Sequence, residues 1–147
     1  MGIEGNIAET KGLVIGYRNR RRIFTVMKGI SLQARRGELV ALIGRNGTGK
    51  STLLRTLIGL QPALGGDIML DGRTLHDTGS SQLPRIVSFV STEPVTVRNI
   101  RVRDVVALGR FPYTNWIGTQ SASDSEVVTE ALEATGLTRL AERSIDS

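Results

Sequence analysis

Apolar and β-branched residues recur through the first 43 positions in the manner of short β-strands. The pattern predicts strands around Ile7–Ile15, Ile23–Met27 and Ile30–Ala34, with a turn at Arg35-Arg36-Gly37. The next segment, Glu38–Ile43, is apolar at nearly every position, which is typical of a strand buried on both faces. This predicted strand leads directly into a glycine-rich segment.

Helical spacing follows the glycine-rich segment. Thr52–Leu60 carries leucine and isoleucine on one predicted face, with Gly59 near its end, and Pro62 and Gly65-Gly66 then interrupt the pattern. A β-hairpin with a tight turn is predicted by three successive segments, Asp67–Leu70, Asp71-Gly72 and Arg73–Leu75.

The remaining pattern predicts one more strand and two helices. Ile86–Val90 is an apolar strand candidate, and Val102–Leu108 has helical spacing up to the following glycine. Ser123–Glu126 matches a helix capping box and predicts an amphipathic helix that ends before Gly136. One face of this helix would hold Val127, Val128, Ala131 and Leu132. This order of elements predicts an α/β fold of the P-loop type with a β-rich N-terminal part.

The glycine-rich segment Gly44–Ser51 matches the phosphate-binding pattern G-x-x-x-x-G-K-[ST] at every fixed position. Its glycines, at 44, 47 and 49, allow backbone angles that a Cβ would block, so that successive N–H groups can turn toward one phosphate. Lys50 is a mobile cation that can bridge the β- and γ-phosphates, and the Ser51 hydroxyl can complete the coordination of Mg²⁺. The alternative is a glycine-rich turn with a coincidental lysine.

We therefore predict that the chain binds Mg-ATP, with the helix N-terminus completing the phosphate cradle. Lys50 is also the predicted catalytic residue. The predicted nucleotide-binding residues of this segment are Gly44, Arg45, Asn46, Gly47, Thr48, Gly49, Lys50, Ser51 and Thr52.

Positive charge is concentrated near the N-terminus. The net charge is +5, and residues 1–36 hold eight Lys and Arg against Glu4 and Glu9. The cluster Arg18–Arg22 suits phosphates, nucleic acid or a membrane surface, or else it is a solvated hairpin tip. Only Tyr17 and Phe24 accompany these arginines, too few aromatic rings for a nucleic-acid platform, so we do not expect a nucleic-acid partner.

Other bulk properties exclude several classes of protein. The chain has no cysteine, which excludes disulfides and cysteine metal sites. No apolar stretch is long enough to span a bilayer, and the first residues lack the apolar region of a secretory signal, which favours the cytoplasm.

The residues around the loop resemble the ATP-binding subunits of ABC transporters. The run from Gly44 to Leu53 is the extended form of the loop in that family, Arg36–Gly44 is similar to its lead-in, and Gly66–Gly72 is similar to its hairpin after the helix. The resemblance covers essentially the whole chain. It implies a P-loop NTPase core of ABC type, with an N-terminal antiparallel β subdomain and the start of a helical subdomain.

The resemblance divides the chain into three parts of one incomplete ATP-binding domain. Residues 1–43 would be the β-rich part and the strand that leads to the loop, residues 44–95 the loop, helix and core strands, and residues 96–147 the start of the helical subdomain. Arg143–Ser147 resembles the residues just before the family's signature sequence. The signature, the Walker B aspartate and the catalytic glutamate would follow, so we expect this chain to be an N-terminal portion that binds nucleotide weakly and hydrolyses it poorly.

Individual roles follow from the same resemblance. Tyr17 matches the aromatic residue that stacks on adenine, with an ordinary exposed strand aromatic as the alternative. Thr92 stands where the family has a glutamine that contacts the nucleotide-bound Mg²⁺, and neighbouring Glu93 is a possible substitute. Arg101 replaces a helix-capping threonine and cannot accept backbone N–H bonds.

Two further predictions rest on sequence position. His76 lies in the polar segment after the predicted hairpin and is expected to be a surface residue. Ile68–Asp71 comes too early in the chain for Walker B and is followed by the turn residue Gly72, so it is expected only to mimic that motif.

The segment Val105–Tyr113, followed by Trp116-x-Gly118, is similar to importers of iron-siderophore, haem and cobalamin type. The similarity implies a second ATP-binding subunit, transmembrane permease subunits, and a peripheral position on the inner face of the cell membrane. Local core packing is the alternative for these aromatic residues. Two other functions stay open: a nucleotide- and nucleic-acid-binding module of a soluble ABC protein, and an inert product that binds nothing.

Overall fold

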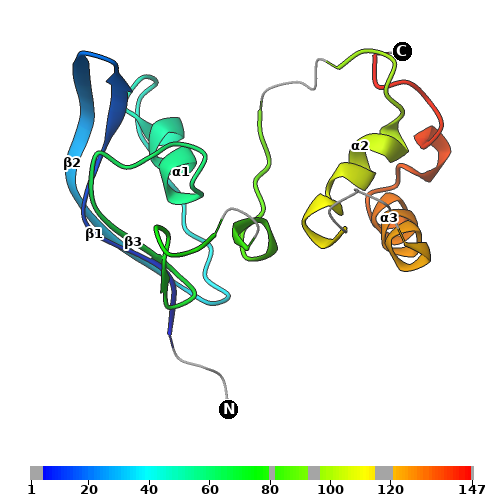
Figure 1. Ribbon diagram of the computed structural model, residues 1–147, viewed down its shortest axis with the longest axis horizontal. Coiled ribbons are helices and arrows are strands. Elements are labelled where there is room, and N and C mark those ends of the chain that lie inside the picture. Colours follow the sequence, from blue (N-terminus) through cyan, green and yellow to red (C-terminus); the bar gives the residue numbers. More distant parts are fainter. Residues whose placement is uncertain (1–4, 80–81, 93–96, 115–120, 147) are drawn as a thin grey trace. The chain divides into compact units, whose positions relative to one another are not determined.

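A computed structural model describes residues 5–79, 82–92, 97–114 and 121–146 (Figure 1). The chain forms two compact units, Met1–Phe89 and Val90–Ser147. Trp116 and Glu93, which carry predictions above, lie outside the described residues.

The first unit is built on a four-stranded antiparallel sheet. Its strands are β1 (Asn6–Asn19), β2 (Arg22–Arg35), β3 (Gly65–Leu70) and β4 (Arg73–Thr74), in the spatial order β2-β1-β3-β4. β1 and β2 form a long hairpin that turns at Arg20-Arg21 (Figure 1). The prediction of two short strands at 23–27 and 30–34 is wrong, because β2 runs through both. Gly29, at φ +68°, lies where one extra residue of β2 is accommodated, so the strand bulges and continues.

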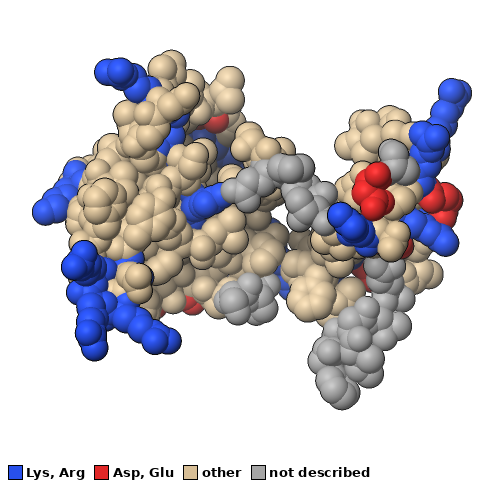
Figure 2. Space-filling view, turned by 90° about the horizontal axis from the view of Figure 1, so that it is seen from above, with Lys and Arg blue, Asp and Glu red and all other residues tan. Residues whose placement is uncertain are grey.

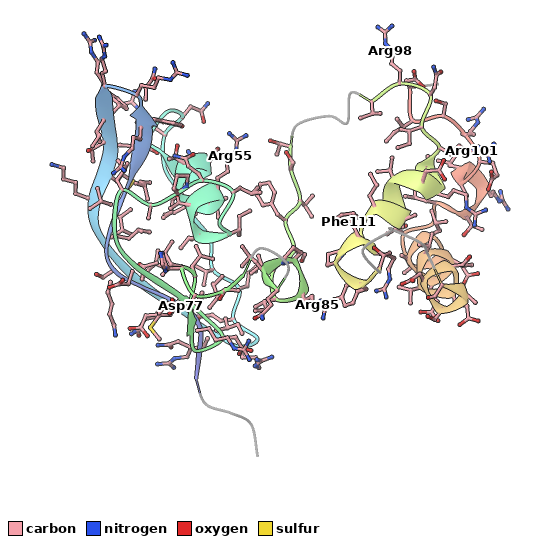
Figure 3. The ribbon with its side chains drawn as sticks, viewed as in Figure 1. Arg55, Asp77, Arg85, Arg98, Arg101 and Phe111 are labelled. Carbon is pink, nitrogen blue, oxygen red and sulfur yellow. The ribbon has the colours of Figure 1, made fainter. Side chains whose placement is uncertain are left out.

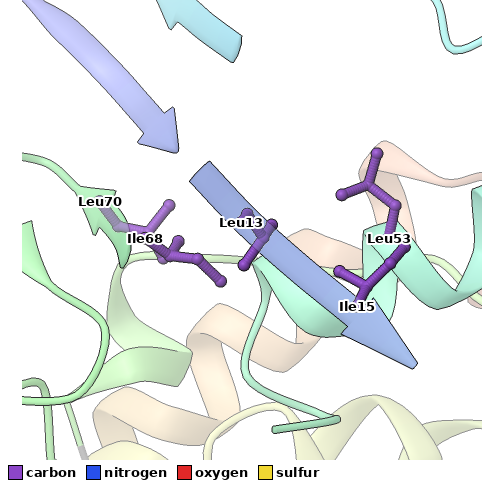
Figure 4. Close-up of a cluster of buried hydrophobic side chains, with 5 residues drawn as sticks. All are labelled: Leu13, Ile15, Leu53, Ile68 and Leu70. Atoms are coloured by element: carbon purple, nitrogen blue, oxygen red, sulfur yellow. The ribbon is translucent and has the colours of Figure 1, made fainter. Parts of the chain in front are cut away.

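The helix α1 (Lys50–Leu57) packs on this sheet. Leu53 joins two residues from β1 and two from β3 in the buried core (Figure 4), which consists of Leu13, Ile15, Leu53, Ile68 and Leu70. The helix begins earlier and ends earlier than predicted. Gly59 follows its last turn at φ +73°, a left-handed conformation that ends helices, as the sequence pattern indicated.

The predicted hairpin after α1 is confirmed. Met69 pairs with Thr74 across β3 and β4, and both turn residues, Asp71 and Gly72, have positive φ, as tight two-residue hairpin turns require. Asp71 is a turn residue and forms an exposed ion pair with Arg36. This agrees with the prediction that Ile68–Asp71 belongs to a hairpin. The His76 side chain is 99% exposed, which confirms the prediction of a surface residue.

Two predicted strands do not form. Residues 38–43 adopt no regular structure, Leu39 is 97% and Ile43 is 90% exposed, and residues 39–43 form no backbone hydrogen bond with another described residue. Residues 86–90 likewise form no strand, and follow the 3₁₀ turn η1 (Leu83–Arg85). A strand buried on both faces needs hydrogen-bonding neighbours on both sides. The described residues supply neither segment with such neighbours.

The second unit consists of short helices. They are α2 (Val102–Leu108), η2 (Phe111–Tyr113), α3 (Ala122–Ala134) and η3 (Thr138–Leu140). The predicted bounds of α2 are confirmed, and Gly136 ends α3 at φ +70° as predicted. The predicted capping box is wrong by two residues. Ser121 is the N-cap and Asp124 closes the box, because an aspartate at this position reaches back to the N-cap N–H as a glutamate does.

The start of α2 shows how the missing threonine cap is replaced. Arg101 is the N-cap residue and makes no side-chain cap, as predicted. The first backbone N–H groups of the helix instead donate to carbonyl oxygens after η3: Val102 to Arg143 and Arg103 to Ala141, each at 3.0 Å. Both arginines, at 101 and 103, also pair with Glu142, and this lowers the pKa of its carboxyl group.

No helix among the described residues is long and apolar enough to cross a membrane.

Candidate nucleotide-binding site

The segment Gly44–Gly49 forms a tight loop before α1. Gly47 (φ +81°) and Gly49 (φ +96°) adopt the left-handed conformation that glycine tolerates, whereas Gly44 does not. A Cβ at Gly44 would instead lie 3.2 Å from the Thr48 hydroxyl, so glycine at position 44 allows the backbone to pack closely against Thr48. Thr48 closes the loop by donating its hydroxyl to the Arg45 carbonyl at 2.8 Å.

The loop and the first turn of α1 present a group of unpaired backbone donors. Gly49 is the N-cap residue and has no side chain to cap the helix. In the described part of the chain, no hydrogen bond uses the backbone N–H groups of Asn46, Gly47, Gly49, Lys50, Ser51 and Thr52. Such groups at the N-terminus of a helix attract anions through hydrogen bonds and the helix dipole.

The Lys50 ammonium lies over the start of the loop. It donates to the carbonyl oxygens of Gly44 and Arg45, both at 2.7 Å, and these two bonds leave its third N–H for another acceptor. The Ser51 side chain is exposed and bonds no other described residue, so its hydroxyl is available as an oxygen ligand. Ammonium, amide and hydroxyl groups together fit a polyphosphate with its cation.

Strand β2 packs against the loop. A Cβ built on Gly49 would lie 2.5 Å from Val26 Cγ1, and the Met27 sulfur lies next to the same point. The loop backbone therefore packs directly on the strand, and any side chain at 49 would push them apart. The sequence pattern gave no indication of this contact, because 23 positions separate the two residues.

The same hairpin brings Tyr17 to the first turn of α1. Its hydroxyl shares a 2.8 Å hydrogen bond with the hydroxyl of Thr52, which is buried. The rest of the tyrosine remains in contact with solvent, at 52% exposure. Tyr17 and Thr52, predicted from separate parts of the chain, thus lie together beside the loop.

Other predicted residues are not placed with the loop. Thr92 is exposed and belongs to the second unit, and its contact with Mg²⁺ stays a prediction. In the second unit, Phe111 is 73% exposed, so the alternative of local core packing does not hold for it. Tyr113 lies under the Arg110 guanidinium at 4.2 Å, and Arg110 also bonds the buried carboxylate of Asp124 at 2.8 Å.

The family model of the ABC transporter matches residues 27–147. The chain belongs to this family. The match runs through the loop, α1 and both units, and agrees with the fold class implied by the resemblance: an ABC-type P-loop core with an antiparallel β part and the start of a helical part.

Relatives of this ABC chain include proteins named for siderophore transport. It is 34% identical to the achromobactin transport ATP-binding protein CbrD of Dickeya dadantii over 94% of this chain and 50% of that protein. It is 35% identical to the ferric enterobactin transport ATP-binding protein FepC of Escherichia coli, over 97% of this chain and 52% of that protein. The chain thus spans about half the length of the curated relatives it matches.

Solved structures show the same fold. The structure of an ATP-binding subunit of an ABC transporter matches with a TM-score of 0.71 and 29% identity, over 92% of this chain and 53% of that one. A dimeric ATP-binding cassette bound to ADP and Pi matches with a TM-score of 0.73 at 23% identity, over 92% of this chain and 60% of that one. The second match supports the fold alone.

Proposed function

We propose that this chain is the ATP-binding part of an ABC importer subunit, which couples ATP binding and hydrolysis to the uptake of an iron chelate. The observation that carries the proposal is the loop itself, where the unpaired amides of residues 46–47 and 49–52 lie with the Lys50 ammonium. The names of the relatives support an iron-siderophore as the solute. Uptake of haem or a corrinoid rests only on the resemblance of residues 105–118. The relatives do not favour the nucleic-acid alternative.

Each group of the loop has a part in holding Mg-ATP. The amides from Asn46 to Thr52 would bind the phosphate oxygens, and Lys50 would exchange its carbonyl acceptors for phosphate and act as the catalytic cation. Ser51 would hold Mg²⁺, with Thr92 as a further predicted ligand. When bound, Mg²⁺ neutralises charge that develops on the phosphates. Tyr17 would lie against the base.

Hydrolysis by the 147-residue chain is expected to be slow. Among the described residues, no Asp or Glu forms a hydrogen bond or ion pair with the loop. Phosphoryl transfer to water also needs a group that orients the attacking water, and the described loop offers only the positive and polar groups around the phosphates.

The proposal includes two protein partners and a location. A second ATP-binding subunit would form a homodimer with this one, and permease subunits would bind the helical part, residues 96–147. Exposed apolar side chains of the second unit support the permease contact: Leu108, Tyr113 and Phe111, of which Phe111 is labelled in Figure 3. The subunit would then lie at the inner face of the cell membrane, as a peripheral protein.

Titration of the chain with Mg-ATP, followed by calorimetry, tests the nucleotide assignment. Lys50→Ala is expected to weaken binding by about tenfold or more, because a charge-assisted hydrogen bond to phosphate is lost. Lys28→Ala is the matched control, since Lys28 is exposed in the same unit. Equal affinities for Lys50→Ala and the unchanged chain would contradict the proposal and favour an inert chain.

Cells of the source organism test the transport assignment. With Lys50→Ala introduced in the gene, uptake of a labelled ferric siderophore is expected to fall, whereas Lys28→Ala should leave it unchanged. Normal siderophore uptake with reduced haem or cobalamin uptake would redirect the proposal to those solutes.

A further inference from the structure

The register of the β1–β2 hairpin pairs two aromatic residues beside the loop. Tyr17 lies directly opposite Phe24, and the next pair toward the turn is Arg18 with Ile23. Directly opposed residues share one face of an antiparallel sheet, and successive pairs alternate between faces. Tyr17 and Phe24 therefore share one face, and Arg18 and Ile23 share the other.

Two contacts show which face of the hairpin is turned toward the loop and α1. The Tyr17 hydroxyl bonds Thr52 in the first turn of α1. Ile15, two residues earlier on the same face of β1, is packed in the core with Leu53 of α1 (Figure 4). The face that carries Tyr17 and Phe24 thus covers the start of the helix.

The positions of Val26 and Phe24 along β2 correspond to the phosphates and the base of a nucleotide, respectively. Val26 lies against Gly49, at the phosphate-binding part of the loop. Phe24 lies two residues from Val26 in the direction of the hairpin turn. A nucleotide whose phosphates lie on the loop would extend its base along this direction, toward Tyr17 and Phe24.

Exposure by itself does not single out Phe24. Phe24 is 67% exposed, but Ile23, its neighbour on the opposite face, is 61% exposed as well. What distinguishes Phe24 is its pairing with Tyr17, with Cβ atoms about 4.5–5.5 Å apart across the strands. Aromatic residues make up only 4% of the chain, and two of them share this surface. Neither is buried, so both rings are accessible to a planar ligand.

We propose that Phe24 is a second base-contacting residue, which forms with Tyr17 a two-ring surface for the nucleotide base. This inference rests on the proposed ATP-binding function. The Thr52 bond fixes the tyrosine, and Phe24 adds apolar and stacking area beside it. Stacking tolerates any base, so the surface favours nucleotides over inorganic phosphates without choosing adenine by hydrogen bonds.

The test compares the binding of Mg-ATP with that of Mg-tripolyphosphate, which lacks the base, to the 147-residue chain. Phe24→Ala is expected to weaken ATP binding about five- to tenfold, the lower part of the range for loss of one stacking ring. Tripolyphosphate binding should be unchanged. Phe24→Tyr should restore the ATP affinity, and Ile23→Ala, on the opposite face, should alter neither ligand.

Other outcomes would contradict either the role of Phe24 or the ATP-binding function on which it rests. Equal loss of ATP affinity in Phe24→Ala and Ile23→Ala, or no loss in either, would overturn the role of Phe24. An equal loss of ATP and tripolyphosphate affinity in Phe24→Ala would also overturn it, since the effect would then be on the loop. Lys50→Ala tests the underlying function separately: if it leaves ATP binding intact, or if the unchanged chain binds no ATP, both proposals fail.

Discussion

The β1–β2 hairpin and the apolar segment at residues 38–43 differ in one respect that decides their structure. Both are rich in residues typical of strands, and the segment is the more continuously apolar of the two. The hairpin forms 14-residue strands because each strand finds its partner across a two-residue turn. The segment remains exposed, since no described residue forms a backbone hydrogen bond with residues 39–43. Apolar sequence thus predicts burial only where hydrogen-bonding partners are present.

The largest expected effect tests whether burial really separates the two regions. Leu13→Ala removes a fully buried side chain from β1 and should lower the free energy of unfolding of the first unit by about 2–5 kcal/mol. Leu39→Ala, the matched change at a 97% exposed position, should stay within about 0.5 kcal/mol. Urea denaturation followed by far-UV circular dichroism measures both. Equal losses in the free energy of unfolding would show that Leu39 is packed, and the two regions would then not differ in burial.

The next effect separates backbone strain from packing at two glycines, one that packs against β2 of the hairpin and one just before residues 38–43. Gly49 and Gly37 both have positive φ, but a Cβ at Gly49 would collide with Val26, whereas a Cβ at Gly37 meets nothing within 4 Å. Gly49→Ala should therefore cost about 2–4 kcal/mol and weaken ATP binding, and Gly37→Ala about 1–2 kcal/mol from strain alone. Urea denaturation of the two variants supplies the measurement. Identical losses in the free energy of unfolding would show that packing against β2 does not stabilise the loop.

The smallest effect concerns the N-terminal cap of α3 in the second unit. Like the strands of the hairpin, this cap is formed by residues close together in the sequence. Ser121→Ala removes the cap of α3 and should lower helix stability by about 1 kcal/mol. Ser123→Ala, at the position that the sequence pattern favoured, should stay within about 0.5 kcal/mol. Thermal melts followed at the helix signal distinguish the two, and a larger loss at Ser123 would restore the original prediction.

The same cap has a defined pH dependence. Bonds from Ser121, first its hydroxyl and then its N–H, and from Arg110 hold the pKa of Asp124 at about 2. Because the folded-state pKa is lowered, the stabilisation is complete above the unfolded value of about 3.9 and is lost as the pH falls through about 2. Asp124→Asn should remove this decline in helix content between pH 4 and pH 2, and a variant that still shows it would assign the decline to another carboxyl group.

Short-range contacts also explain which predictions were confirmed. The two-residue turn at Asp71-Gly72 and the helix stop at Gly136 depend on a few neighbouring residues, and both formed as predicted. The capping box was predicted two residues late because serine recurs at 121 and 123, and only the hydrogen bonds show which one caps α3. The replacement of the Arg101 cap by carbonyls near Glu142 depends on residues about 40 positions away, and no local pattern indicates it.

The sequence by itself was enough to predict the phosphate-binding loop, because the glycines, lysine and serine of the pattern all lie in one short segment. Through its resemblance to a known family, it also predicted that Tyr17 would belong to the site. Only the tertiary structure decided that Gly49 packs on Val26, that Tyr17 bonds Thr52 and that Phe24 lies opposite Tyr17. These contacts depend on strand register, which bulges shift by single residues, and composition does not reveal where the bulges fall.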